Sequence, residues 1–341
     1  MQDLSAADER GPAAPKCSTT AAGLAASDRR ASHAFNILVR QMDADVIIVG
    51  AGPAGLSAAL VLARACRQVL LFDHGHPRNA AATATHGFLT RDGVSPHDLR
   101  AMARDELARY DSVRIVDLEV TDADCDAGAF HVTTIDNQHF SAKKLLLATG
   151  VVDHLPEVPG LREMYGTTVF HCPYCDGYEF RGKRLAVYGC DERGYGLALE
   201  LLGWSKDVVL VSDGPCGLDA KDLARLASRH INVREEKVTR LEGKEGRLER
   251  IFFETGEPLE RDAVFFTTGQ AQRSPLADIL GCHFNDKGTV RTGAYETTHL
   301  KGLYVAGDAS RAVQWIVVAA AEGAEAAYSI NQDLIKEALT S

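Results

Sequence analysis

The stretch Asp45-Val46-Ile47-Ile48-Val49-Gly50-Ala51-Gly52-Pro53-Ala54-Gly55 decides the fold of this chain. Its apolar first half predicts a buried strand, and the G-x-G-x-x-G pattern after it opens a helix. In such a loop the first glycine allows a tight turn, the second lets the backbone approach a pyrophosphate, and the third lets helix and strand pack closely. The N–H groups at the helix start bind the anion. The residues expected to bind a dinucleotide here are Gly50, Gly52, Pro53, Ala54 and Gly55.

A lone glycine motif is weak evidence, but the next segment supplies the expected context. A second strand, residues 68–72, ends on Asp73 about twenty residues after the loop. An acid at this place accepts hydrogen bonds from the ribose of an adenosine. The two patterns together favour a nucleotide-binding βαβ unit over a tight glycine turn in some other α/β unit.

Two thiols one helical turn apart lie in Cys172-Pro173-Tyr174-Cys175-Asp176-Gly177. Cysteines at this spacing close a small disulfide, and near a helix N-terminus one of them has a lowered pKa and attacks other disulfides as a thiolate. His171, directly before the pair, is placed to lower that pKa further. The alternative is half of a zinc site, which needs a second pair. Because the other cysteines are scattered singly, the pattern favours redox chemistry and no metal. These single cysteines are Cys17, Cys66, Cys125, Cys190, Cys216 and Cys282.

Two further strands end in small-residue turns. The first is Leu145-Leu146-Leu147-Ala148-Thr149-Gly150, and Leu303-Tyr304-Val305-Ala306-Gly307-Asp308 repeats the pattern before a long apolar helix expected over residues 313–327. At this point the chain resembles, from about Asp43 to its end, the flavoprotein disulfide reductases with two dinucleotide-binding domains. The resemblance implies FAD as cofactor, with Asp308 placing a carboxylate on its ribityl chain. The residues added to the FAD site are Thr149, Gly150, Gly307, Asp308 and Gln314.

The position of the cysteine pair indicates the subfamily. The pair opens the second domain, and no histidine follows His299, so the chain resembles the low-molecular-weight thioredoxin reductases and not the glutathione reductase type. The runs His171-Cys172-Pro173-Tyr174-Cys175-Asp176-Gly177-Tyr178-Glu179 and His86-Gly87-Phe88-Leu89-Thr90-Arg91-Asp92-Gly93 resemble a branch that contains fungal and bacterial dithiol oxidases of the gliotoxin type. In those oxidases a histidine often follows the second cysteine. This chain has Asp176 there, as true thioredoxin reductases do.

The expected fold is α/β, with two Rossmann-like dinucleotide-binding domains and small antiparallel strand insertions. The FAD-binding domain is discontinuous and comprises residues 42–151 and 270–341, while residues 152–269 form a pyridine-nucleotide-type domain that carries the C-x-x-C pair. Residues 1–41 are rich in Ala, Ser, Pro, Gly and Arg, and we expect a disordered extension there. A start codon assigned too far upstream is the other bland explanation, and four acids disfavour a targeting peptide.

The second nucleotide-binding unit departs from the pattern of the first. A strand is expected over residues 184–189, a helix over 194–202 and another strand over 207–211, but the loop between the first two has Asp191 at the middle glycine position. That side chain would repel a pyrophosphate, and Arg193 would partly compensate. Asp213 stands where a basic run binds the 2′-phosphate of NADPH in similar enzymes, so NADH is favoured over NADPH. The nicotinamide contacts expected are Gly189, Arg193 and Gly194, and the alternative is that no nicotinamide binds.

The resemblance also implies a mechanism. Electrons pass from NAD(P)H through FAD and the cysteine pair to a disulfide substrate, with Cys175 facing the flavin and Cys172 attacking the partner. Asp176 is the expected proton donor and acceptor, which requires a pKa raised by partial burial. Its other interpretation is an acid that only stabilises the dipole of a helix. A domain rotation is expected, with hinges at residues 151–153 and near Gly269.

The last helix offers further contacts. Its start, near residues 312–315, would direct N–H groups at the pyrimidine edge of the flavin, and Gln314 would add a hydrogen bond. Trp315 is interpreted first as a core residue and second as a neighbour of the ring. Two functions of other kinds stay open. One is a dithiol oxidase that passes electrons to oxygen, with Tyr174, Tyr178 and Phe180 lining its pocket, and the other is a non-catalytic flavin redox sensor.

Composition narrows the partners. The formal net charge is −10 with no basic cluster, which argues against nucleic acid and anionic membrane surfaces. No apolar stretch reaches the roughly 18 residues of a membrane span. Eight cysteines without a regular framework suit a reducing compartment, so the cytoplasm is expected. The expected partner is a thioredoxin-like protein or a small-molecule disulfide or dithiol, and the resemblance implies a homodimer.

Overall fold

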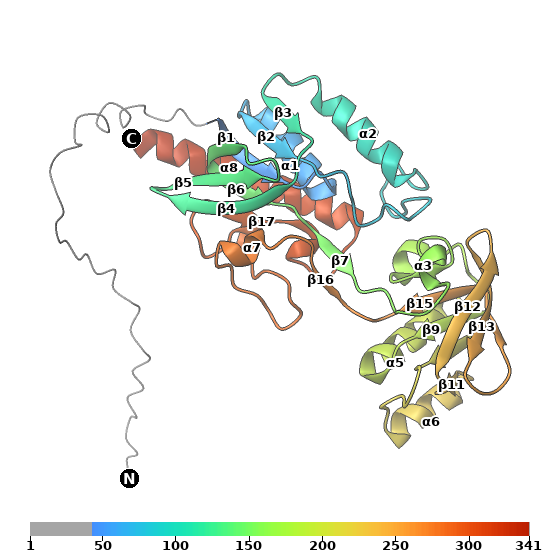
Figure 1. The fold of residues 1–341 in the computed structure, drawn as a ribbon. Coiled ribbons are helices and arrows are strands. Elements are labelled where there is room, and N and C mark those ends of the chain that lie inside the picture. Colours follow the sequence, from blue (N-terminus) through green and yellow to red (C-terminus); the bar gives the residue numbers. More distant parts are fainter. Residues whose placement is uncertain (1–42, 341) are drawn as a thin grey trace, which may run out of the picture. The chain divides into compact units, whose positions relative to one another are not determined.

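The computed structural model describes residues 43–340 of the chain (Figure 1). The expectations for residues 1–41 and for Cys17 lie outside this range. Within it the predicted fold class is confirmed: there are two parallel sheets with helices, the first extended by antiparallel strands and the second accompanied by a separate antiparallel sheet. The domain boundaries themselves stay a prediction.

The first sheet has a parallel core in the order β3-β2-β1-β6-β17. Its strands are β1 (Ala44–Val49), β2 (Val69–Phe72), β3 (Val113–Val116), β6 (His139–Leu147) and β17 (Leu303–Val305). The last strand, β17, comes from the C-terminal part of the chain and pairs with β6. The first sheet is therefore completed by a segment that follows the second domain in the sequence. Helices α1 (Pro53–Arg64) and α8 (Ile316–Thr340) pack together beside this sheet.

Strand β6 also belongs to an antiparallel layer. Its first half pairs with β5 (Ala129–Thr134), which pairs with β4 (Val120–Asp126), and its second half pairs with β1. The turn between β4 and β5 has Ala127 and Gly128 at φ 49° and 83°. Two left-handed residues in a row match the right-handed twist of the hairpin strands.

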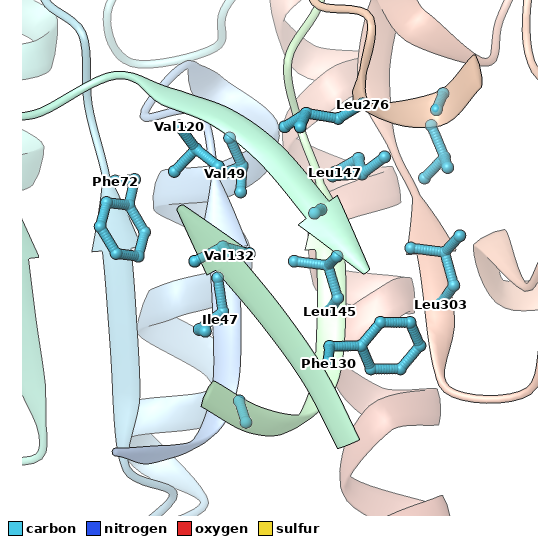
Figure 2. Packing of buried hydrophobic residues seen from close by; sticks show 14 of the residues in the cluster. Ile47, Val49, Phe72, Val120, Phe130, Val132, Leu145, Leu147, Leu276 and Leu303 are labelled. Carbon is cyan, nitrogen blue, oxygen red and sulfur yellow. The ribbon is translucent and has the colours of Figure 1, made fainter. Parts of the chain in front are cut away.

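Alternation along β1 divides the core between these layers. Ile47 and Val49 face the antiparallel strands, where Val132 lies beside Ile47 and Val120 beside Val49 (Figure 2). Val46 and Ile48 point to the opposite face, into the cluster that includes residues of α1 and α8. Because successive side chains of a strand alternate between faces, an apolar run such as 46–49 is expected only where both faces are covered.

The second domain has its own parallel sheet in the order β11-β10-β9-β15-β8. Its strands are β8 (Val169–Phe170), β9 (Leu185–Tyr188), β10 (Val208–Val211), β11 (Asn232–Arg234) and β15 (Ala263–Phe266). The elements packed with it are α5 (Asp191–Glu200), α6 (Ala220–Ser228), and an antiparallel unit of β12 (Val238–Lys244), β13 (Arg247–Phe253) and β14 (Leu259–Glu260).

The chain passes between the two sheets along β7 (Val151–Asp153) and β16 (Gln270–Gln272). These two short strands pair antiparallel, and the His154 N–H donates to the Gly269 carbonyl at 3.0 Å. Both expected hinge segments are therefore parts of one small ribbon. The remaining helices are α2 (Pro96–Leu107), α3 (Leu161–Met164), α4 (Pro173–Asp176) and α7 (Leu276–Ile279).

Two predicted helix boundaries are wrong. Helix α5 begins at Asp191 and not near residue 194, because Asp191 adopts φ 56° and turns the loop earlier. Helix α8 begins at Ile316 and continues to Thr340, because the Gln314 amide donates to the carbonyls of Asp308 and Arg311 and holds the preceding residues in a loop. Ser95 caps α2, since its side chain accepts from the Asp98 N–H at 3.0 Å, as the run Ser95-Pro96-His97-Asp98 predicts.

Candidate active site

A cavity of about 460 Å³ opens where β1, β2, β6 and β17 end. The carboxyl ends of parallel strands are where open α/β sheets bind ligands. The cavity brings together every residue expected to contact FAD except Gly55, together with Cys175 and Asp176 from the second domain. The FAD-site residues on its wall are Gly50, Gly52, Pro53, Ala54, Asp73, Thr149, Gly150, Gly307, Asp308 and Gln314.

The glycine loop has the geometry that a dinucleotide needs. Gly50 has φ 108°, and a Cβ there would lie 2.3 Å from the Ala148 carbonyl oxygen, while one at Gly55 would lie 1.9 Å from the Gly50 oxygen. A Cβ at Gly52 would meet no atom within 4 Å, because this residue faces the cavity. Gly52 also N-caps α1 without any side-chain cap, which leaves the first N–H groups of the helix for an anion. The residues present therefore fit the pyrophosphate of FAD.

Asp73 lies at the end of β2, buried on the wall of this cavity. One carboxylate oxygen accepts from Arg100 at 2.6 Å and Arg104 at 2.8 Å, and the other from the Gly75 N–H at 2.9 Å. Sequence reasoning missed the two arginines, although their spacing on α2 puts them on one face of the helix. They fix the carboxylate in place at the end of the cavity expected to take the adenosine.

Arg78 is the second residue that sequence reasoning missed. It comes from the loop after β2, and its guanidinium donates to Asp308 at 2.8 Å and to the Gln314 side chain at 2.7 Å. The same group forms a two-pronged ion pair with Asp153 of β7. Burial alone would lower the pKa of Arg78, but the hydrogen bonds and charges of Asp153 and Asp308 outweigh it and raise that pKa. Arg78 is therefore a permanent cation beside Asp308.

The cysteine pair lies where β8 runs into α4. Cys172 is the N-cap of this helix, and its sulfur accepts from the Cys175 N–H at 3.2 Å. Proline at the next position fits the first turn of a helix. The two cysteines form a disulfide, with their Cα atoms 5.3 Å apart. Cys175 lines the cavity, whereas Cys172 is not part of its wall.

Asp176 follows the pair, and a substantial share of its carboxyl is protonated near neutral pH. Burial raises the pKa of its carboxyl to about 7, with His86 opposing and Glu179 reinforcing the shift. His86 also lies on the cavity wall, and its Nε2 is 3.7 Å from a Glu179 oxygen. Sequence reasoning used His86 only for a family resemblance. A carboxyl that titrates near neutral pH beside a thiol pair can both donate and accept a proton.

Several expectations about the surrounding residues are wrong. Burial lowers the pKa of His171, which disfavours the charged imidazole that would lower the pKa of a thiol. Trp315 is not a core residue: it is 38 % exposed, lies on the cavity wall, and contacts the Tyr174 ring at 5.2 Å. Tyr178 is exposed under Arg181, and Phe180 packs on Phe170 inside the second domain. Of the three aromatic residues expected to line the substrate pocket, Tyr174 lines this cavity, and Tyr178 and Phe180 do not.

The glycine loop of the second domain is filled by its own chain. Gly189 and Gly194 pack as the first and third glycines, since a Cβ at Gly194 would lie 2.7 Å from the Gly189 oxygen. The Asp191 N–H donates to the Cys216 carbonyl at 2.9 Å, and a Cβ at Gly217 would lie 2.4 Å from an Asp191 carboxylate oxygen. The structure brings Gly189, Arg193 and Gly194 to one loop but not to the cavity that holds Cys175.

Asp213 is also engaged by the second domain itself. Its carboxylate accepts from the Tyr188 hydroxyl at 2.5 Å and from the Val238 N–H at 2.6 Å. The expectation that Asp213 favours NADH did not include these two bonds, which come from residues 25 positions away in the sequence. Both of its oxygens already have a donor.

Two absences concern the described residues alone. Between 43 and 340 there is no group of three or more His, Cys, Asp or Glu side chains suited to a metal ion. In the same range, no helix has the length and apolar composition needed to cross a membrane.

A dinucleotide cavity that receives one cysteine of a C-x-x-C disulfide from a second dinucleotide-type domain defines a class of protein, the FAD-dependent disulfide oxidoreductases. The comparisons with known proteins give the family. The chain belongs to the pyridine nucleotide-disulphide oxidoreductases, whose family model matches residues 44–323. Enzymes of this thioredoxin reductase-like family bind FAD and use NAD(P)H.

Relatives cover most of the chain. Thioredoxin reductase tcpT of Claviceps purpurea is 33 % identical over 275 residues, which are 77 % of this chain and 86 % of the relative. Thioredoxin reductase sirT of Leptosphaeria maculans is 28 % identical over 305 residues, 84 % of this chain and 93 % of the relative. The solved structure of an oxidoreductase from Agrobacterium tumefaciens matches with a TM-score of 0.81 and 33 % identity, over 86 % of this chain and 99 % of that one.

Proposed function

We propose that this enzyme exchanges two electrons between FAD and an external disulfide or dithiol through Cys172 and Cys175. The observation that carries the proposal is the position of Cys175 on the wall of the FAD-type cavity, with Cys172 off that wall. Bound FAD would supply the two-electron exchange with the pair. The fit of Gly50, Gly52 and Asp308 to FAD supports this assignment.

The residues divide the thiol chemistry between them. The Cys172 thiolate attacks a sulfur of the partner disulfide, which forms a mixed disulfide and releases one partner thiolate. Asp176 donates the proton that this leaving thiolate takes up. The Cys175 thiolate then attacks the Cys172 sulfur, so that the second partner thiolate leaves and the Cys172–Cys175 disulfide forms again. The partner gains two electrons and the pair loses two, and the same steps in reverse oxidise a dithiol.

Substitution of each cysteine tests these roles. Cys172→Ser and Cys175→Ser are each expected to abolish disulfide exchange while the protein keeps its flavin, because neither side chain holds the cofactor. Cys125→Ser is the control, since Cys125 is an exposed free thiol in β4. Turnover retained in either pair variant would move the chemistry to another site.

A dithiol oxidase is the second candidate, and the second glycine loop favours it. Asp191 stands at the middle glycine position and contacts Cys216 and Gly217, which supports a loop that no longer admits a pyrophosphate. Anaerobic stopped-flow mixing with NADH, NADPH and dithiothreitol, followed by flavin absorbance, separates the two candidates. We expect the dithiol to bleach the flavin, and NADH to act at least as well as NADPH. Bleaching by neither nucleotide, with rapid reoxidation in air, would identify the oxidase.

The partner and setting complete the proposal. A thioredoxin-like protein or a small disulfide or dithiol is the expected substrate, because a thiol pair exchanges with sulfur and nothing else in the site selects another group. We further propose a cytoplasmic homodimer. Sedimentation of the purified protein would give the oligomeric state, and fractionation of its source cells the compartment.

A further inference from the structure

Arg78 connects the FAD-type cavity to both strands of the ribbon between the domains. On the cavity side it donates to Asp308 and Gln314, at 2.8 and 2.7 Å. On the ribbon side its Nε donates to Asp153 of β7 at 2.8 Å and its Nη2 to the other oxygen of the same carboxylate at 2.5 Å. A weaker bond, 3.3 Å, reaches Gln270 of β16. Its guanidinium therefore has partners in three separate segments of the chain.

Asp153 continues the connection into the second domain. The oxygen that accepts from Arg78 Nε also accepts from the Tyr165 hydroxyl at 3.1 Å, and that hydroxyl lies 3.3 Å from the His171 Nδ1. Tyr165 follows α3, and His171 directly precedes Cys172. An unbroken chain of polar contacts thus runs from the FAD site through the ribbon to the residue next to the redox pair.

The burial of these groups makes the contacts stiff. The side chains of Arg78 and Asp153 are only 14 % and 6 % exposed. A two-pronged arginine–carboxylate pair fixes both distance and orientation, and burial reduces its screening by salt. Breaking one partner of such a pair is costly, since the other charge stays buried without compensation.

We propose that Arg78 and Asp153 form an inter-domain clamp that holds the second domain in the orientation where Cys175 lies on the wall of the FAD-type cavity. The clamp consists of Arg78, Asp153, Asp308 and Gln314. Arg78 is a positioning residue in this scheme: it acts through the ribbon and exchanges no electrons itself. A rotation of the second domain about β7 and β16 must break either the pair of Arg78 with Asp153 or the bond of Asp153 to Tyr165, so these contacts set the balance between this orientation and others. The inference rests on the proposed function only in the role that it gives to Cys175.

Asp153 offers the sharper variant, because it is not on the cavity wall and its loss leaves the bonds of Arg78 to Asp308 and Gln314 in place. Asp153→Ala removes the carboxylate, and Asp153→Asn keeps its shape without its charge. Arg184→Gln is the matched control, since Arg184 pairs with Asp262 and Glu260 inside the second domain alone. Flavin content and melting temperature of each variant show whether it has folded.

The measurement is the distribution of distances between a label at Glu106 on α2 and a label at Lys221 on α6, in the full flavin-loaded chain. Both residues are exposed. The labels need a chemistry that spares thiols, because Cys66 and Cys125 are exposed as well. We expect one narrow distribution for the wild type and for Arg184→Gln. In Asp153→Ala a second component should grow about tenfold over its wild-type share, and Asp153→Asn should give a smaller increase.

A second readout connects the clamp to chemistry. Flavin bleaching by dithiothreitol should slow several-fold in Asp153→Ala, because fewer molecules present Cys175 to the cavity. A folded Asp153→Ala protein with the wild-type distance distribution would overturn the clamp, even if the wild type exchanges disulfides as proposed. A changed distribution in a protein whose wild type is inert toward every thiol would support the clamp and remove the proposed function.

Discussion

The two glycine loops of this protein have the same local fold but different surroundings. Both connect a parallel strand to a helix, and both have glycines where strand and helix touch: Gly50 and Gly55 after β1, Gly189 and Gly194 after β9. They differ at the middle position. Gly52 faces an open cavity, whereas Asp191 uses its N–H on the Cys216 carbonyl and its side chain against Gly217.

This difference separates what a fold requires from what a ligand requires. The outer glycines are needed for close packing of helix on strand, so they remain wherever the βαβ unit remains. The middle glycine serves only the approach of a phosphate group. A domain can therefore keep its Rossmann topology while its loop is filled from within, and the C-x-x-C pair of the second domain can act at the other domain's cavity.

The largest effect is expected when the first loop is given the residue of the second. Gly52→Asp should fold, because Gly52 has φ −80° and an added Cβ has no neighbour within 4 Å. The carboxylate would then occupy the phosphate position, and the affinity for FAD should fall about 1000-fold, so that little flavin stays with the chain. Absorbance near the flavin band after purification measures it. Gly196→Ala, an exposed glycine within α5, is the control, and a Gly52→Asp protein with full flavin content would contradict our view of the cavity.

The next prediction concerns Asp176, the carboxyl beside the cysteine pair of the second domain. Asp176→Asn should lower disulfide exchange about 100-fold, as loss of a general acid does, with flavin content unchanged. Stability gives an independent readout. The native carboxyl keeps its proton up to a pKa of about 7 while an unfolded aspartate loses it near 3.8, so wild-type stability falls as the pH rises between these values.

The asparagine variant has no such titration. The difference between its melting temperature and that of the wild type should therefore increase from about pH 4 to pH 7 and stay constant above pH 7. Asp124→Asn, an exposed acid of β4, controls for surface charge. Parallel melting curves over this pH range would show that Asp176 titrates normally.

A smaller effect is expected when the second loop is given the residue of the first. Asp191 has φ 56°, so Asp191→Gly relieves a left-handed aspartate and removes a negative charge from the phosphate position. The affinity for NADH, measured by the concentration dependence of anaerobic flavin bleaching, should rise roughly fivefold to tenfold. Glu192→Gln removes the neighbouring charge but leaves the loop closed. An equal gain in that variant would mean that net charge matters and the middle position does not.

The smallest effect belongs to a matched pair of tyrosines. Tyr188→Phe removes the bond to Asp213, and Tyr304→Phe removes the bond of 2.6 Å to Asp333 in the first domain. Each should lower the free energy of unfolding by about 1 kcal/mol, which denaturant titration measures. Only Tyr188→Phe should also change the response to NADH, because only its partner lies beside the second loop. A change in both or in neither would argue against a role of Asp213 in closing that loop.

The sequence by itself determined the features that depend on neighbours along the chain. The strand–loop–helix of residues 45–55, the C-x-x-C pair and the Ser95 cap each lie within a short segment, so local chemistry specifies them. The raised pKa of Asp176 was also expected, because a proton donor beside thiols needs one. The family followed from the same segments.

Only the tertiary structure decided the contacts between distant segments. Arg78 lies 75 residues from Asp153 and 230 from Asp308, and Tyr188 lies 25 from Asp213. Nothing in the sequence around these residues marks their partners, because ion pairs and hydrogen bonds depend on which side chains the fold brings within about 3 Å. The sequence showed that the second glycine loop was unusual. That Cys216 and Gly217 fill it was visible only in the folded chain, because these residues are distant from the loop in the sequence.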